Sequence, residues 1–305
     1  MSQDKVPALK LNDYLSKDKE VRAQFVKDLY NSFKDYGFVV LTNHTIKPEL
    51  LNRAYAVQEK LFDLPLEVKK QHFLNNGGQR GYTFFGTENA KNTKLSDLKE
   101  FWHVGRESAI ANTWPKELPE FQPIMEELIS HLDKTGDIIL EALEESLGCK
   151  PGYFKGIVKD GLSVLRLLHY PTVPENLSKN GNLRSFEHFD IDLLTLLVSA
   201  QGGGLEILKN GEWIAIESDP EFIICPAGDM LERMCNFNLP STMHRVTNPD
   251  PSKNVSRYSI PYFIHPRPEV MLDLLPKYAN ETPKLPIISS GDFLNERLKE
   301  IGLKK

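Results

Sequence analysis

From Leu162 onward, the sequence consists of short apolar segments separated by turn-forming residues. The segments are rich in leucine, β-branched and aromatic residues and are shorter than a typical helix, which favours β-strands. We predict strands at Ser163–Tyr170, Leu193–Ser199, Leu205–Lys209, Trp213–Ile216, Phe222–Cys225, Arg245–Thr247 and Tyr258–Ile264. Asn210-Gly211 joins two of them and is a strong hairpin signal. Several short strands of this kind predict an antiparallel sandwich or barrel of the jelly-roll type.

The first half of the chain has a helical pattern instead. Between Asp18 and Tyr36, apolar residues recur every four positions, and Gly37 follows as a helix stop. The segment Phe38–Leu41 predicts a short buried strand. Further helices are predicted from Pro48, a favoured first-turn residue, and from about Pro123 to Leu147. Residues 75–94 are rich in glycine and asparagine and are predicted to form a loop.

Composition and charge exclude several classes of partner. The chain has 37 Lys and Arg against 42 Asp and Glu, so its net charge of −5 gives no general reason to bind nucleic acid or an anionic membrane. The three cysteines have no C-x-x-C spacing, which fits reduced thiols better than disulfides. The N-terminus lacks the apolar core that a secretory signal requires, and no apolar run approaches the ~20 residues of a membrane span. We therefore expect a soluble, cytoplasmic protein that binds neither nucleic acid nor membranes.

The tripeptide His188-Phe189-Asp190 is a candidate metal-binding motif. In an extended segment, residues two apart point the same way, so His188 and Asp190 would face the sheet interior together. A second histidine on another strand would complete a set of two imidazoles and one carboxylate, which leaves three positions of an octahedral iron open. His244 is the candidate for it. An H-x-D tripeptide also occurs by chance in many proteins, but the apolar strand directly after it supports a site here.

Arg257 and Ser259 form a second candidate pair, since they are also two residues apart and can face one cavity. A guanidinium offers two parallel hydrogen bonds to a carboxylate, and a neighbouring hydroxyl adds a third. A surface ion pair is the alternative reading of an R-x-S sequence. The position on the strand expected after His244 favours a carboxylate clamp.

Further short stretches follow one another in a specific order and spacing. They are Gly37-Phe38 before Asn43-His44, Arg80-Gly81-Tyr82, Lys99-Glu100-Phe101, Leu168-His169-Tyr170-Pro171, Leu194-Thr195-Leu196-Leu197, Gly203-Gly204-Leu205, Gly228-Asp229-Met230 and Ser241-Thr242-x-His244-Arg245-Val246. Together with the two motifs above, they resemble the isopenicillin-N-synthase-like branch of the iron(II)/2-oxoglutarate-dependent oxygenases. The resemblance covers nearly the whole chain.

The resemblance implies a mixed α+β fold with a double-stranded β-helix (jelly-roll) core and flanking helices. We expect residues 1–160 to form the helical N-terminal portion, corresponding to the non-haem dioxygenase N-terminal region. Residues 161–270 would form the jelly-roll oxygenase core, and residues 271–305 would form C-terminal helices packed on it.

The resemblance also implies the roles of the site residues. His188, Asp190 and His244 would bind Fe(II), and Arg257 and Ser259 would hold the distal carboxylate of 2-oxoglutarate with help from Tyr170. The expected reaction uses O2 to hydroxylate, desaturate or cyclise a small, carboxylated or amino-acid-like metabolite and releases succinate and CO2. Candidate substrate contacts are Arg80, Tyr82, Phe101, Arg184, Glu187 and Phe263.

Three alternatives stay open at this point. The first is an oxidase of the isopenicillin N synthase type, which uses iron and O2 without 2-oxoglutarate and grips a substrate carboxylate with the same clamp. The second is a non-catalytic binding protein, since fold does not dictate function. The third is a zinc hydrolase, since two histidines and a carboxylate can also bind zinc. The sequence carries no G-x-S-x-G or P-loop motif that would indicate other chemistry.

Overall fold

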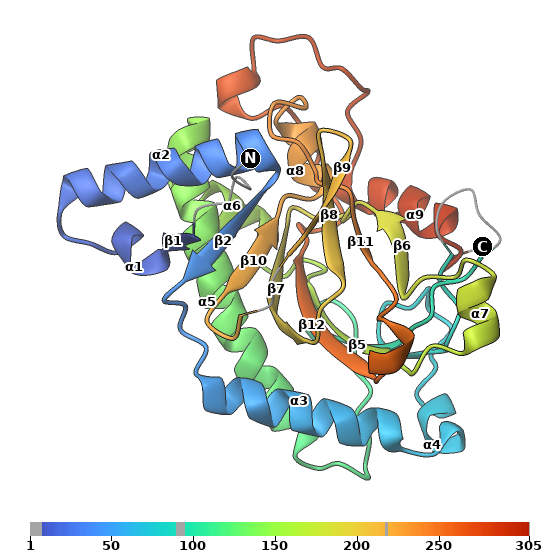
Figure 1. The fold of residues 1–305 in the computed structure, drawn as a ribbon. Helices are drawn as coiled ribbons and strands as arrows, with labels where there is room; N and C mark the ends of the chain where they lie inside the picture. The colour runs from blue at the N-terminus through green and yellow to red at the C-terminus, as the bar shows by residue number, and fades with distance from the viewer. Residues whose placement is uncertain (1–7, 90–94, 217–218, 305) are drawn as a thin grey trace.

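The computed structural model describes residues 8–89, 95–216 and 219–304. Two β-sheets lie at its centre (Figure 1). The larger sheet contains β1 (Ala8–Lys10), β2 (Phe38–Thr42), β3 (Gly81–Thr83), β4 (Glu100–Gly105), β5 (Val164–Tyr170), β7 (Leu194–Gln201), β10 (Ile223–Pro226) and β12 (Arg257–Ile264), in the order β1-β2-β10-β7-β12-β5-β4-β3. The smaller sheet contains β6 (Ser185–His188), β8 (Leu205–Lys209), β9 (Glu212–Ala215) and β11 (His244–Val246), in the order β6-β11-β8-β9.

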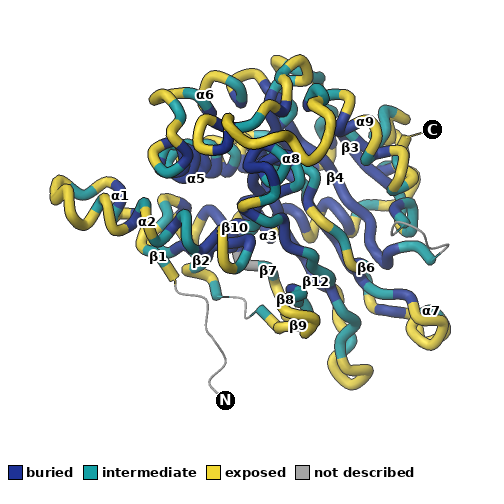
Figure 2. Tube along the Cα trace, turned by 90° about the horizontal axis from the view of Figure 1, so that it is seen from above, coloured by how far each residue is buried: buried dark blue, intermediate teal, exposed yellow. Residues whose placement is uncertain are grey.

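The helices flank these sheets. They are α1 (Leu11–Tyr14), α2 (Lys19–Tyr36), α3 (Pro48–Asp63), α4 (Leu66–Lys70), α5 (Phe121–Leu147), α6 (Tyr153–Val158), α7 (Glu175–Lys179), α8 (Asp229–Met234) and α9 (Ser290–Glu300), with 3₁₀ turns η1 (Pro251–Lys253) and η2 (Pro276–Tyr278). The long helix α5 contacts α2, α3 and α6 and packs on β7 and β12 (Figure 1). Many residues of α5 are buried, and Figure 2 colours them dark blue. A Cβ at Gly136 would lie 2.5 Å from Ile264 Cδ1, so glycine permits this close packing.

The predicted strands from Leu162 onward are all present, with ends that shift by at most two residues. The hairpin between β8 and β9 is confirmed: Asn210 and Gly211 have φ of 52° and 83°, as a type I′ turn requires. The prediction of a mixed α+β fold with a jelly-roll core is confirmed.

The helix predicted up to Gly37 is confirmed as α2, and its two ends show why it forms. The Asp18 carboxylate accepts a hydrogen bond from the Glu20 N–H at the N-terminus. Gly37 ends the helix in the left-handed conformation, with φ of 73°. A Cβ at Gly37 would lie 1.9 Å from Thr242 Oγ1, and Thr242 donates to the Tyr36 carbonyl at 2.8 Å. The end of α2 therefore anchors the segment that leads into His244.

The first 160 residues contribute more than helices. The segment predicted as a loop, residues 75–94, contains the strand β3, which pairs with β4, and its residues 90–94 lie outside the described residues. β1 and β2 extend the opposite edge of the larger sheet, where β2 pairs with β10. Since strands from both sides of residue 160 share one sheet, the predicted domain boundary stays a prediction.

The C-terminal region contains less helix than predicted. Within residues 271–304, only η2 and α9 are helical. Pro283 and Pro286 disfavour a helix in the segment before α9, because proline lacks the N–H that a helix interior needs, whereas Pro276 opens η2. In the parts of the chain that the structure describes, no helix is both long and apolar enough to cross a membrane. The three cysteines are free, and the predicted cytoplasmic location stays a prediction.

Candidate metal centre

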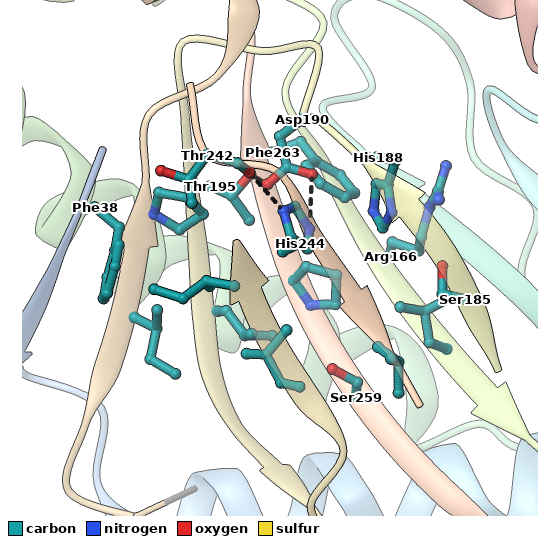
Figure 3. A pocket seen from close by; sticks show the side chains of 18 of the residues that line it. Phe38, Arg166, Ser185, His188, Asp190, Thr195, Thr242, His244, Ser259 and Phe263 are labelled. Atoms are coloured by element: carbon teal, nitrogen blue, oxygen red, sulfur yellow. Dashed lines mark hydrogen bonds and ion pairs between the residues drawn. The ribbon is translucent and has the colours of Figure 1, made fainter. Parts of the chain in front are cut away.

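His188, Asp190 and His244 come together between the two sheets (Figure 3). β6 and β11 are antiparallel neighbours in which His188 and His244 face each other in register. Asp190 follows two residues after the end of β6. One ligand atom from each of the three side chains lies within 4.8 Å of the other two. The predicted triad is therefore assembled as a group that could hold one metal ion.

Backbone carbonyls fix the orientation of both imidazoles. Nδ1 of His188 lies 2.7 Å from the Phe186 carbonyl, and Nδ1 of His244 lies 3.0 Å from the Thr242 carbonyl. Since a carbonyl only accepts, Nδ1 carries the proton in each ring and Nε2 offers its lone pair to the metal. Burial, together with the neighbouring His244, lowers the pKa of His188 to about 4. His188 is therefore neutral at physiological pH, as a metal ligand must be.

A hydroxyl orients the carboxylate of the triad. Asp190 is buried, and its Oδ2 accepts a hydrogen bond of 2.6 Å from Thr195 Oγ1 on β7. Its Oδ1 lies 3.7 Å from His244 Nε2, on the side where a shared metal would sit. Asp192 lies beside this pair, with Oδ2 3.1 Å from Thr195 Oγ1. Burial and then the Asp190 charge raise the pKa of Asp192 well above its usual range.

We expect Thr195→Val to weaken Fe(II) binding by ~10-fold, because loss of an outer-shell partner typically costs 10- to 100-fold in metal affinity. Valine fills the same volume but cannot donate to Asp190. Competition with a chromophoric chelator measures the affinity. Thr195→Ser keeps the hydroxyl and should restore it; a serine variant as weak as the valine variant would show that packing, and not the hydrogen bond, is responsible.

The predicted clamp lies in the same cavity, which we call the inner cavity and which His188, His244, Tyr170, Arg257 and Ser259 help to line. The Arg257 side chain is buried, and its Nε donates to the Gly203 carbonyl at 3.0 Å. Among the described residues, its Nη1 has no hydrogen-bond partner. The Tyr170 ring lies 5.1 Å from the guanidinium carbon. A buried guanidinium with an unpaired N–H next to the Ser259 hydroxyl fits a bound carboxylate.

A larger cavity of about 580 Å³, which we call the outer cavity, adjoins the inner one. His188, Asp190, Lys99, Arg166 and Phe263 line both. Residues of α9 and the following segment to Leu303 complete its wall. A molecule in the outer cavity would therefore lie next to the metal position.

The structure places some of the candidate substrate contacts in the cavity walls and the others outside them. Phe263 lines both cavities and Glu187 lines the outer one. Arg80, Tyr82, Phe101 and Arg184 line neither cavity and make internal contacts instead. Their contacts are a hydrogen bond from Arg80 to the Ile110 carbonyl, one from Tyr82 to Glu100, one from Arg184 to the Val255 carbonyl, and stacking of Phe101 on Arg166.

Lys99 was not predicted as a site residue, although it is buried beside the metal position. Its Nζ lies 2.6 Å from Asp97 Oδ2 and 3.1 Å from Ser185 Oγ. Asp97 Oδ1 in turn accepts a hydrogen bond of 2.9 Å from the Phe186 N–H, and the carbonyl of Phe186 orients His188. Lys99-Glu100-Phe101 is visible in the sequence as a motif, but its partners on other segments are not.

Comparison with known proteins places the chain in a family. Residues 161–266 match the 2OG-Fe(II) oxygenase superfamily model, and residues 6–122 match the model named non-haem dioxygenase in morphine synthesis N-terminal. The 2-oxoglutarate-dependent dioxygenase ucsF of an Acremonium species is 31% identical over 96% of this chain and 98% of its own length. The chain belongs to the 2OG-Fe(II) oxygenase superfamily. It is a 2-oxoglutarate-dependent dioxygenase, and its cofactors are Fe(II) and 2-oxoglutarate.

Two further proteins are similar to this dioxygenase over nearly their whole length. The proline hydroxylase buaE of Petromyces alliaceus is 31% identical over 92% of this chain and 93% of its own. A full-length Neurospora crassa protein, crystallised in complex with α-ketoglutarate and thymine, has a TM-score of 0.88 and 29% identity, and the match covers 98% of each chain.

Glu232 of the dioxygenase is expected to make the free energy of unfolding depend on pH. It lines the outer cavity, and burial raises its pKa to about 7, against a usual value near 4.3. The folded state therefore binds this proton more tightly than the unfolded state does. The resulting stabilisation is fully present below about pH 4 and is lost as the pH rises through 7. Glu232→Gln keeps an acceptor for the Ser241 N–H, which lies 3.0 Å away.

We expect the free energy of unfolding of wild type to fall relative to Glu232→Gln by on the order of 2 kcal/mol between pH 5 and pH 8. Urea unfolding of both proteins at the two pH values measures the difference. A difference that stays constant over this range would show that Glu232 titrates normally in the folded protein.

Proposed function

We propose that this dioxygenase binds Fe(II) through His188, Asp190 and His244, holds 2-oxoglutarate through Arg257 and Ser259, and hydroxylates a small molecule in the outer cavity. The observation that carries the proposal is the convergence of the triad and the buried, unpaired Arg257 N–H on one cavity. The residues fit both cofactors: two Nε2 atoms and a carboxylate suit Fe(II), and the guanidinium suits an acid.

The protein's own contribution to the reaction is positioning. Iron and 2-oxoglutarate would supply the activation of O2 and the oxidation of a C–H bond. The Phe186 and Thr242 carbonyls and the Thr195 hydroxyl hold the three ligands in one orientation. Leu168, Ile207 and Val246 line the inner cavity with apolar surface and limit the access of water to the site.

The substrate class is the finer question. The sequence favours a carboxylated or amino-acid-like metabolite, and the resemblance to a proline hydroxylase supports it. The resemblance to the Neurospora crassa protein, which was crystallised with thymine, supports an uncharged ring instead. The two classes differ in charge, so the charged side chains that line the outer cavity bear on the choice between them.

The test of the proposed function is the release of succinate from 2-oxoglutarate. We expect purified protein to release succinate only when Fe(II), O2 and 2-oxoglutarate are all present, with Zn(II) unable to replace Fe(II). Slow release without a primary substrate is sufficient as a readout. Substrate oxidation that consumes O2 without any need for 2-oxoglutarate would instead establish an oxidase of the isopenicillin N synthase type.

A further inference from the structure

The buried charges that line the outer cavity neutralise one another. Apart from the metal ligand Asp190, the buried acids among the described lining residues are Glu88 and Asp97, and the buried cation is Lys99; Arg166 is largely buried. Lys99 Nζ lies 2.7 Å from Glu88 and 2.6 Å from Asp97. Arg166 Nη2 lies 3.1 Å from Glu88. Two cations therefore face two acids, and none of the four is left unpaired.

The direction of the pKa shifts agrees with this pairing. Burial alone would raise the pKa of Glu88, but the charges of Arg166 and Lys99 outweigh it and lower the pKa to about 2. Burial and the Arg166 charge lower the pKa of His103 well below its usual range, so this cavity-lining histidine is neutral. Next to these four groups, a charged substrate group of either sign would lose its hydration without meeting a net opposite charge, which is costly.

Arg166 keeps hydrogen-bonding capacity in spite of its pairing. Its guanidinium carbon lies 4.3 Å from the centre of the Phe101 ring and 5.2 Å from that of Phe263. Its Nε donates to His103 Nε2 at 2.6 Å, and its two terminal nitrogens reach Glu88. A guanidinium has five N–H groups, so two remain for another acceptor. Figure 3 shows Arg166 close to His188, beside the metal position.

His265 directly follows β12 and lines the outer cavity, and one nitrogen of its ring is available for a hydrogen bond. The residue is 7% exposed, and within the described ranges its Nδ1 has no hydrogen-bond partner. Burial lowers the pKa of His265 to about 4, so the ring is uncharged at neutral pH. A buried polar atom without a partner in a cavity wall indicates that something else completes its hydrogen bond.

We propose that the outer cavity selects a flat substrate without charged groups, such as a cyclic amide, and that His265 and Arg166 are the side chains that bind its polar edge. The inference rests on the proposed function, because it assigns the substrate of that same site. Arg166 donates to a carbonyl oxygen of the ring, while His265 Nδ1 pairs with a second polar atom. Phe263 offers an aromatic face against which the ring can pack.

Paired probes that differ by one charged group test the inference. Uracil is compared with orotate, and 2-pyrrolidinone with pyroglutamate, by equilibrium dialysis against protein loaded anaerobically with Fe(II) and 2-oxoglutarate. We expect at least one neutral probe to bind at least tenfold more tightly than its charged partner. Tighter binding of a charged partner in either pair, or no binding of either neutral probe at millimolar concentration, would overturn the inference.

The variants His265→Leu and His265→Gln test the residue itself. We expect leucine to weaken binding of the neutral probe about tenfold and glutamine, which keeps a polar group, to recover most of it. Unchanged binding by the leucine variant would remove His265 from the site. The visible charge-transfer band of the iron–2-oxoglutarate complex serves as the control in every sample. A wild-type protein without this band would contradict the proposed function itself, and with it this inference.

Discussion

Replacing His244 with alanine is expected to abolish Fe(II) binding and to lower succinate release by more than ~100-fold, since loss of an outer-shell partner alone can cost that much. The reason is geometric. Among the described residues, three candidate metal ligands converge on one position, and two of them are imidazoles on adjacent strands. Without His244, a single imidazole and one carboxylate remain to hold the ion, and neither can move to replace the missing ligand.

Iron content after anaerobic loading and desalting measures this effect directly. His131→Ala is the matched control, because His131 lies on α5 and its Nδ1 is bonded to Thr45, away from both cavities. The control should retain one iron per chain. Full iron binding by the His244 variant would mean that the metal is held elsewhere.

The second large effect is expected at Arg257. Arg257→Leu should raise the Kd for 2-oxoglutarate by ~100-fold, because removing one partner of a buried, hydrogen-bonded charge pair costs roughly 2–5 kcal/mol. Fe(II) affinity should stay within about twofold of wild type, because Arg257 lies outside the triad. Titration of the charge-transfer band with 2-oxoglutarate measures the change.

The comparison with Arg257→Lys makes this test specific. Lysine keeps the charge but lacks the planar pair of N–H groups that donates two parallel hydrogen bonds to a carboxylate. We therefore expect a Kd between those of wild type and Arg257→Leu. If both variants bind 2-oxoglutarate as wild type does, Arg257 is not the clamp. If 2-oxoglutarate binding is retained while turnover of a carboxylated substrate is lost, Arg257 holds the substrate instead.

Much of the fold and the metal centre could be predicted because their signals are local. The spacing of His188 and Asp190 places both side chains on one side of an extended segment, and that follows from backbone geometry alone. The helix up to Gly37 and the Asn210-Gly211 hairpin are likewise specified by neighbouring residues. The pairing of His188 with His244 needed one long-range assumption, which the register of β6 and β11 confirms.

The rest depends on contacts between distant segments. Lys99 joins Glu88, Asp97 and Ser185, and no local pattern reveals such a network. Arg80 and Arg184 were predicted to contact substrate because arginines often bind anions, yet each is used to bind backbone carbonyls. His265 gave no signal at all in the sequence, because its unused Nδ1 is a property of the folded cavity.

The most direct test of the central assignment is an anomalous difference map, recorded at the iron absorption edge from crystals grown anaerobically with Fe(II) and 2-oxoglutarate. We predict one dominant peak within coordination distance of His188 Nε2, His244 Nε2 and an oxygen of Asp190. The density of 2-oxoglutarate should extend from that peak to the Arg257 guanidinium. A dominant peak elsewhere, or an iron at the triad with 2-oxoglutarate bound away from Arg257, would contradict the assignment.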